Sequence, residues 1–148
     1  MPQAEDGVDM NDQKPRILAI DDEEGFRDML RQYFTPRDYD IDVVAEGEDG
    51  LKAFREKEYD VVILDLKMAG LDGDEIMRKM REIDGEITAI FVSAFNDNEV
   101  TKDRLLREGA YAYLEKPLSS LKDLEALINK AAAEKKAGNT DDQDSRGG

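Results

Sequence analysis

The chain has 148 residues, of which 40% are hydrophobic and 39% are charged, so it can bury one ordinary core and calls for no second domain. Its 21 basic and 36 acidic residues give a net charge of -15, which predicts a surface that repels nucleic acid. The lack of cysteine excludes disulfides and thiolate metal sites, and no apolar run is long enough for a membrane span or a secretory signal, so we expect a cytoplasmic protein.

Composition divides the chain into three segments. Residues 1–14 are acidic and polar, and we expect a flexible segment there. Residues 15–136 carry the apolar patterning and predict a single folded domain. Residues 137–148 offer almost no apolar side chain to bury, which predicts a disordered tail or the remnant of a linker.

Strands and helices alternate along the folded part. The apolar run of residues 16–20 predicts a first strand, and apolar residues at helical spacing after it, such as Phe26 and Leu30, predict a first helix. Residues 40–46 alternate weakly, which suits a strand at the edge of a sheet, and a second helix follows. Residues 61–64 form a short, unbroken apolar run, which is typical of a central parallel strand covered by helices on both faces.

The alternation continues to the end of the domain. After a third helix, residues 86–93 predict a fourth strand and residues 110–116 a fifth. The helix between them is predicted to begin at residues 96–99, where a cap-like asparagine precedes a glutamate by three positions, and to end at Gly109. Because this helix has few apolar positions, we expect it to be loosely held. A last helix follows Pro117.

This pattern predicts a parallel sheet with right-handed crossovers and helices on both faces, which is a doubly wound α/β fold. The carboxyl ends of the strands then share one edge, where ligands bind in open sheets of this kind. Polar residues end or follow four of the five predicted strands: Asp21, Asp22, Asp65, Ser93 and Lys116.

These side chains suit phosphoryl transfer. Three crowded carboxylates repel one another unless a cation neutralises them, and hard oxygen ligands suit Mg2+, with Mn2+ as a substitute. Zinc is disfavoured because the chain lacks histidine and cysteine. Lys116 and the Ser93 hydroxyl could hold the oxygens of a phosphoryl group. Asp65 could be the nucleophile that forms an acyl phosphate.

Each residue also has a simpler interpretation when it is taken alone. Asp21 and Asp22 could cap the first helix. Ser93 could bond the backbone at a strand end, and Lys116 could be a solvated surface lysine. Tyr113 could merely pack at the edge of the sheet. The placement of the polar residues at one edge favours a common site over separate accidents.

The chain resembles the response-regulator receiver domains of two-component signalling, such as the single-domain regulators of chemotaxis, in four segments: AIDDEEGFRDMLR, VVILDLKMAGLDG, IFVSAF and YAYLEKP. The resemblance runs from about Arg16 to Lys135. It implies the flavodoxin-like receiver fold, with five parallel strands in the order 2-1-3-4-5 and five helices.

The resemblance implies a role for each of the three aspartates at the predicted edge and for Lys67. Asp65 would be the phosphoacceptor. Asp22 would ligate Mg2+ directly, Asp21 mainly through water, and Lys67 through its backbone carbonyl. One departure from the family is Ala69, which stands where proline is frequent, and we expect a less rigid loop there.

The other matched residues would sense the phosphoryl group. Ser93 would contact it through its hydroxyl and Lys116 through its ammonium, and the bond between Lys116 and Pro117 would be cis. Tyr113 matches the aromatic switch residue of the family. We expect Tyr113 to turn inward when Asp65 is phosphorylated.

The chain contains no histidine, so a phosphohistidine donor must be another molecule. We expect a histidine kinase, a histidine phosphotransfer protein or a small phosphodonor. The chain would be a signalling switch that catalyses its own phosphorylation and slow dephosphorylation, not a turnover enzyme. A downstream protein would bind the face of the fourth helix, fifth strand and fifth helix, with no direct contact to nucleic acid or membrane.

Two other functions fit parts of the sequence. A haloacid-dehalogenase-type phosphatase also forms an aspartyl phosphate, but its D-x-D block needs an acid where this chain has Lys67. A receiver-like module that signals without phosphorylation is disfavoured, because every acidic, hydroxyl and lysine position of the site is filled.

Overall fold

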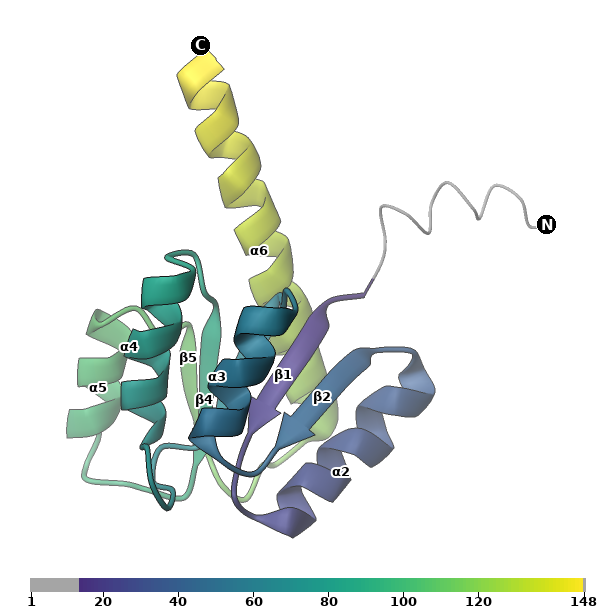
Figure 1. Cartoon of the computed structure of the whole chain (residues 1–148), viewed down its shortest axis with the longest axis vertical. Coiled ribbons are helices and arrows are strands. Elements are labelled where there is room, and N and C mark those ends of the chain that lie inside the picture. The colour runs from purple at the N-terminus through teal and green to yellow at the C-terminus, as the bar shows by residue number, and fades with distance from the viewer. Residues whose placement is uncertain (1–13, 148) are drawn as a thin grey trace.

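The computed structural model describes residues 14–147, with side chains through residue 135. Within these residues, one parallel sheet has the strand order β2-β1-β3-β4-β5. Its strands are β1 (Arg16–Ile20), β2 (Asp40–Val44), β3 (Val61–Leu64), β4 (Ala89–Ser93) and β5 (Ala112–Glu115). The helices are α2 (Glu24–Phe34), α3 (Gly47–Glu56), α4 (Gly73–Ile83), α5 (Val100–Arg107), α6 (Leu121–Gly147) and the short 3-10 helix η1 (Thr35–Arg37). The predicted doubly wound α/β fold, with its strand order and its five α-helices, is confirmed for the described residues (Figure 1).

Different helices cover the two faces of the sheet, because neighbouring residues of a strand point to opposite faces. In β1, Ile17 and Ala19 belong to a buried cluster that includes side chains of α2 and α6. Leu18 and Ile20 belong to a second cluster with side chains of α3, α4 and α5. All of β3 is buried, which explains why residues 61–64 form an unbroken apolar run in the sequence.

Strands β1 and β3 have the predicted bounds, whereas β2, β4 and β5 are shorter than the sequence predicts, and β5 covers Ala112–Glu115 rather than residues 110–116. The weakly alternating segment forms the edge strand β2, as expected, but the strand ends at Val44. The fourth strand begins at Ala89 rather than at residue 86, because a turn precedes it. In this turn, the carboxylate of Asp84 accepts a hydrogen bond from the amide of Glu86 at 2.9 Å, and its carbonyl accepts one from the amide of Ile87 at 3.2 Å.

The predicted domain boundaries at residues 15 and 136 can be compared with the structure only in part. Helix α6 packs Leu124 and Ile128 against the sheet, and its backbone is helical to Gly147, through residues for which the sequence predicts a disordered tail. Side chains are described only to residue 135, so a boundary at residue 136 stays a prediction. The predicted flexible segment at residues 1–14 lies, except for its last residue, outside the described residues. Among the helices that the structure describes, none is both long and apolar enough to cross a membrane.

Helix α5, which the structure describes in full, buries one side chain, Leu105, and leaves Val100 65% exposed. This agrees with the expectation of a loosely held helix. It begins at Val100 rather than within residues 96–99. The reason is that Asn98 and Glu99 have left-handed backbone conformations, with φ angles of 61° and 72°, which do not continue a right-handed helix.

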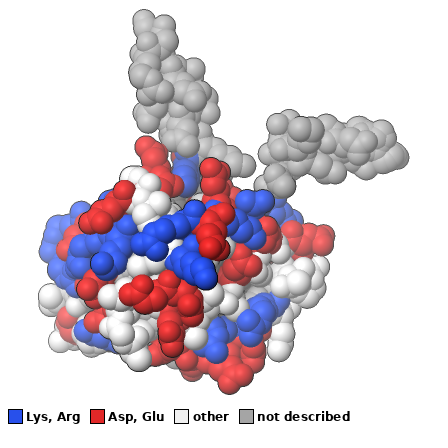
Figure 2. All heavy atoms as spheres, in the orientation of Figure 1, with Lys and Arg blue, Asp and Glu red and all other residues white. Residues whose placement is uncertain are grey.

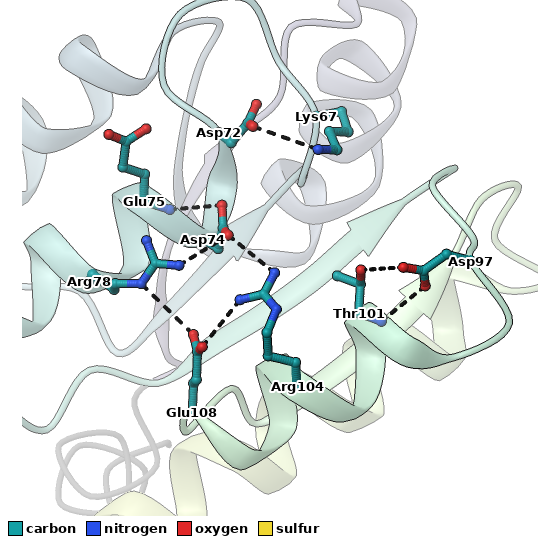
Figure 3. A network of polar contacts seen from close by, with 9 residues as sticks. All are labelled: Lys67, Asp72, Asp74, Glu75, Arg78, Asp97, Thr101, Arg104 and Glu108. Atoms are coloured by element: carbon teal, nitrogen blue, oxygen red, sulfur yellow. Dashed lines mark hydrogen bonds and ion pairs between the residues drawn. The ribbon is translucent and has the colours of Figure 1, made fainter.

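The predicted cap of α5 is wrong. The side chain of Asn96 accepts a hydrogen bond from the amide of Asn98 at 2.8 Å and so closes a local turn. The carboxylate of Asp97 instead serves the first turn of the helix. It accepts hydrogen bonds from the amide of Thr101 at 2.9 Å and from its hydroxyl at 2.6 Å (Figure 3).

An ionic network ties α5 to α4 (Figure 3). The guanidinium of Arg104 lies 3.3 Å from the carboxylate of Asp74 on α4 and 3.2 Å from that of Glu108. On α4, Arg78 pairs with Asp74 at 3.1 Å, and Arg81 donates a 2.7 Å hydrogen bond to the carbonyl of Glu108. The Asp74 side chain is only 18% exposed, so solvent screens these pairs less than it screens ordinary surface pairs. Polar contacts therefore supplement the single apolar anchor of α5.

Charge is spread unevenly over the surface. Figure 2 shows side chains of both signs interleaved on one face, with basic ones gathering on the side of α4 and α5. These two helices contain six basic residues against four acidic ones, although the whole chain has a net charge of -15. The surface of α4 and α5 should therefore repel anionic partners less than the net charge of the whole chain suggests. The absence of nucleic-acid contact stays a prediction.

We expect Leu105→Ala to open α5 ahead of the rest of the domain. The substitution removes the buried anchor of the helix, and loss of a buried leucine side chain costs about 2 to 5 kcal/mol. Hydrogen exchange of amides 100–108, followed by mass spectrometry, should accelerate by a larger factor than exchange in β3. Leu106→Ala is the matched control, since that side chain is already 38% exposed. Equal loss of protection in α5 and β3 would show that α5 does not open independently.

Candidate functional site

Backbone hydrogen bonds continue beyond the carboxyl ends of the strands and fix the residues that follow. The amide of Asp65 donates to the carbonyl of Ile20 at 3.1 Å, and the amide of Lys116 donates to the carbonyl of Ser93 at 2.9 Å. The amide of Asp21 donates in the same way to the end of β2 at 3.1 Å. The side chains that the sequence places at separate strand ends therefore leave the sheet at one edge.

Asp21, Asp22 and Asp65 form a carboxylate cluster, because each offers an oxygen and these oxygens lie within 4.8 Å of one another. Asp21 and Asp65 are buried, whereas Asp22 is exposed. Three carboxylate oxygens beside an open face fit the preference of Mg2+ for hard oxygen ligands and retained waters. The carbonyl of Lys67 stays a predicted further ligand.

A depression opens over the cluster. It is lined by Asp22, Glu23, Asp65, Lys67, Ser93, Ala94, Phe95 and Lys116. Glu23, Ala94 and Phe95 are not among the site residues predicted from the sequence. Glu23 could have been noticed because it directly follows two predicted metal ligands. Phe95 contributes its backbone amide and carbonyl to the site, and no pattern of side chains in the sequence reveals such contacts.

Lys116 supplies the positive charge of the site. Its Nζ donates hydrogen bonds to Asp21 at 2.8 Å and to Glu23 at 2.9 Å, and it lies 3.6 Å from the carboxylate of Asp65. The Lys116 side chain is only 13% exposed, so it is not a solvated surface lysine. The bond between Lys116 and Pro117 is cis.

Burial governs the electrostatics of the site. Burial raises the pKa of Asp21 above its ordinary value, and the charge of Asp65 adds to this rise, whereas the hydrogen bond from Lys116 opposes it. Burial alone would lower the pKa of Lys116. The hydrogen bonds to Asp21 and Glu23 outweigh that effect and raise the pKa of Lys116, so its ammonium stays charged. One ammonium faces several carboxylates, which favours an additional cation.

Ser93 and Tyr113 are joined through the backbone of Phe95. The Ser93 hydroxyl accepts a hydrogen bond from the Phe95 amide at 3.2 Å, and the Tyr113 hydroxyl donates one to the Phe95 carbonyl at 2.7 Å. The Tyr113 ring is buried and stacks on Phe91, with ring centres 6.1 Å apart. Burial raises the pKa of Tyr113, so its hydroxyl keeps the proton that it donates. The inward orientation expected of Tyr113 in the phosphorylated protein is the orientation that the structure has.

The loop from Asp65 to α4 is closely packed. A Cβ atom at Gly73 would lie 2.1 Å from the carbonyl oxygen of Asp65, so a larger residue would displace the backbone of the predicted phosphoacceptor. The ammonium of Lys67 lies 3.8 Å from the carboxylate of Asp72 (Figure 3). The amide of Ala69 donates a 3.4 Å hydrogen bond to Asp22, a contact that proline could not make.

Comparison with known proteins points to one family. The family model of the response regulator receiver domain matches residues 17–129. Transcriptional regulatory protein AfsQ1 of Streptomyces coelicolor is 35% identical over 104 residues, which cover 70% of this chain and 45% of that protein. Sporulation initiation phosphotransferase F of Bacillus subtilis is 31% identical over 102 residues, which cover 69% of this chain and 82% of that protein. The chain spans about half the length of the transcriptional regulators that it matches.

Solved structures agree with this result. The response regulator receiver domain protein of Clostridium thermocellum has a TM-score of 0.76 at 31% identity, covering 82% of this chain and 97% of that chain. The response regulator protein TrrA of Thermotoga maritima, solved in complex with Mg2+-BeF, has a TM-score of 0.68 at 30% identity. That match covers 78% of this chain and 97% of that chain.

Mg2+ should raise the melting temperature, because a ligand that binds only the folded state stabilises it. We expect Asp22→Ala to lose most of this gain, since the exposed carboxylate of Asp22 completes the cluster. Thermal melts in EDTA and in a series of millimolar Mg2+ concentrations measure the effect. Asp28→Ala, on the surface of α2, is the control. If the melting temperature of the wild-type protein does not change over this range of Mg2+ concentrations, the result would count against the metal site.

Proposed function

Because the chain belongs to the family of response regulator receiver domains, we propose that it is a phosphoacceptor of a two-component phosphorelay, with Asp65 as the residue that receives the phosphoryl group. Family membership makes the chain a signalling domain. The placement of Asp65 carries the proposal further: it is 7% exposed, shares a 4.8 Å cluster with two other carboxylates, and lies 3.6 Å from the ammonium of Lys116.

The proposed transfer uses the Asp65 carboxylate as nucleophile. One of its oxygens attacks the phosphorus of a phosphohistidine, and the histidine leaves with the electron pair of the P–N bond as the P–O bond forms. Lys116 and the Ser93 hydroxyl donate hydrogen bonds to the phosphoryl oxygens. A divalent cation held by Asp21 and Asp22 would neutralise charge on the transferring group.

The donor is another molecule in this proposal, because the 148 residues contain no histidine. A histidine kinase or a histidine phosphotransfer protein supplies the group, and a small phosphodonor can replace it in vitro. The chain acts as a switch that catalyses its own phosphorylation and slowly hydrolyses the acyl phosphate. A cytoplasmic location, and the absence of contacts to membrane and nucleic acid, stay predictions from the sequence.

Ser93 links the proposed chemistry to the surface. A phosphoryl group on Asp65 would draw the Ser93 hydroxyl into a charge-assisted hydrogen bond and weaken its contact with the amide of Phe95. Since Phe95 also holds the hydroxyl of Tyr113, the change reaches β5. Helix α5 has one buried side chain and can repack at low cost, so the face of α5, β5 and α6 is the proposed binding surface for a downstream protein.

We expect Asp65→Asn to abolish labelling by acetyl phosphate and by the cognate kinase, because the amide is not a competent nucleophile. The wild-type label should be released by hydroxylamine, which cleaves acyl phosphates. Asp103→Asn, on α5, is the control and should label normally. Full labelling of the Asp65→Asn protein would sink the assignment of the phosphoacceptor.

Beryllofluoride, which mimics the phosphoryl group, should change amide NMR shifts at Ser93, at Tyr113 and across residues 96–108. We expect Ser93→Ala to shorten the reach of these changes, because it removes the hydroxyl that bonds the Phe95 amide. Changes confined to the loop after Asp65 would contradict the proposed coupling and would place the output surface elsewhere.

A further inference from the structure

We propose that Glu23 is a positioning residue that acts through Lys116, competing with the phosphoryl group for its ammonium. This inference rests on the proposed function of Asp65. The Glu23 carboxylate lies in the depression over the carboxylate cluster and accepts a 2.9 Å hydrogen bond from Lys116. It therefore lies where the charge of an incoming phosphoryl group must be accommodated.

The ammonium of Lys116 already donates hydrogen bonds to two carboxylates other than that of Asp65. An ammonium has three N–H donors, and two of them are directed to Asp21 at 2.8 Å and Glu23 at 2.9 Å. The carboxylate of Asp65 lies 3.6 Å away, which is too far for a hydrogen bond. Lys116 is thus near the proposed nucleophile while its hydrogen bonds go to other acids.

The third N–H of Lys116 is available to a phosphoryl group on Asp65. Because Nζ now lies 3.6 Å from the Asp65 carboxylate, the added negative charge also draws the whole ammonium toward Asp65, which weakens one of its two existing contacts. The contact to Asp21 is the costly one to break. The Asp21 side chain is 2% exposed, and without Lys116 its carboxylate would be left buried beside another acid. The Glu23 side chain is 62% exposed, so water can replace Lys116 as its partner. Glu23 is therefore the partner that gives way.

The backbone keeps Glu23 in position for this competition. Glu23 is the N-cap residue of α2, and its amide donates a 2.9 Å hydrogen bond to the carboxylate of Asp21. One carboxylate thus bonds both the backbone of Glu23 and, through its other oxygen, the ammonium of Lys116. These contacts fix the backbone of Glu23, from which its side chain extends to Lys116.

Glu23→Gln tests the competition, because it removes the charge and keeps the shape of the side chain. The matched control is Glu24→Gln, which makes the same change of net charge on the next residue. Among residues 14–135, the side chain of Glu24 makes no ion pair. With Mg2+ present, we expect Glu23→Gln to bind beryllofluoride about two- to fivefold more tightly than Glu24→Gln, the range that corresponds to one exposed charge pair. The initial rate of labelling by acetyl phosphate should rise by a similar factor, and added salt should reduce the difference.

A second measurement needs neither metal nor phosphodonor. In EDTA, acetylation of Lys116 by an amine-reactive ester, read by peptide mass spectrometry, should be at least about twofold faster in Glu23→Gln than in Glu24→Gln, because the Lys116 side chain loses one of its two carboxylate partners and is held less firmly in the site. Equal acetylation rates, or equal beryllofluoride affinities, would overturn the role of Glu23 alone. Weaker binding of Mg2+ and beryllofluoride by Glu23→Gln would also overturn it and would make Glu23 a contributor to the metal site. Failure of the wild-type protein to bind beryllofluoride would instead overturn the proposed function and this inference together.

Discussion

The site depends on one electrostatic constraint, which is that two buried carboxylates share a single ammonium. Asp21 and Asp65 end at the same edge because β1 and β3 are parallel neighbours, and their like charges repel more strongly where water is excluded. Lys116 follows β5, which β3 and β4 separate from β1, so its side chain spans the middle of that edge. The sheet order thereby brings together charges that are far apart in the sequence and leaves an excess of negative charge, which the proposed cation would balance.

The same edge is also where the rigid and the weakly anchored parts of the molecule meet. The central strands are buried on both faces, whereas α5 is held by Leu105 and by the ionic network on α4. That network includes Asp74, which directly follows Gly73, and Gly73 packs against the carbonyl of Asp65. The first turn of α4 thus contacts both the proposed phosphoacceptor residue and α5, which buries only one side chain.

Much of this arrangement could be predicted from the sequence, because it follows from patterns of side chains. The unbroken apolar run before Asp65 identified a central strand, and the polar residues at the strand ends identified one edge of the sheet. The start of α5 could not be predicted in this way, since left-handed backbone at Asn98 and Glu99 is set by local turn geometry. The contact of Glu23 with Lys116 could not be predicted either, because these residues are 93 positions apart in the sequence and are brought together only by the fold.

The link between Ser93 and Tyr113 runs through a peptide backbone, and this affects how freely the sequence can change. The amide and the carbonyl of Phe95 make the two hydrogen bonds, while its ring lies 5.1 Å from the ammonium of Lys67 at the mouth of the depression. Any residue except proline supplies the same amide and carbonyl. Position 95 can therefore vary in its side chain, and so in what the depression presents to solvent, without breaking the proposed link between Ser93 and the surface of β5.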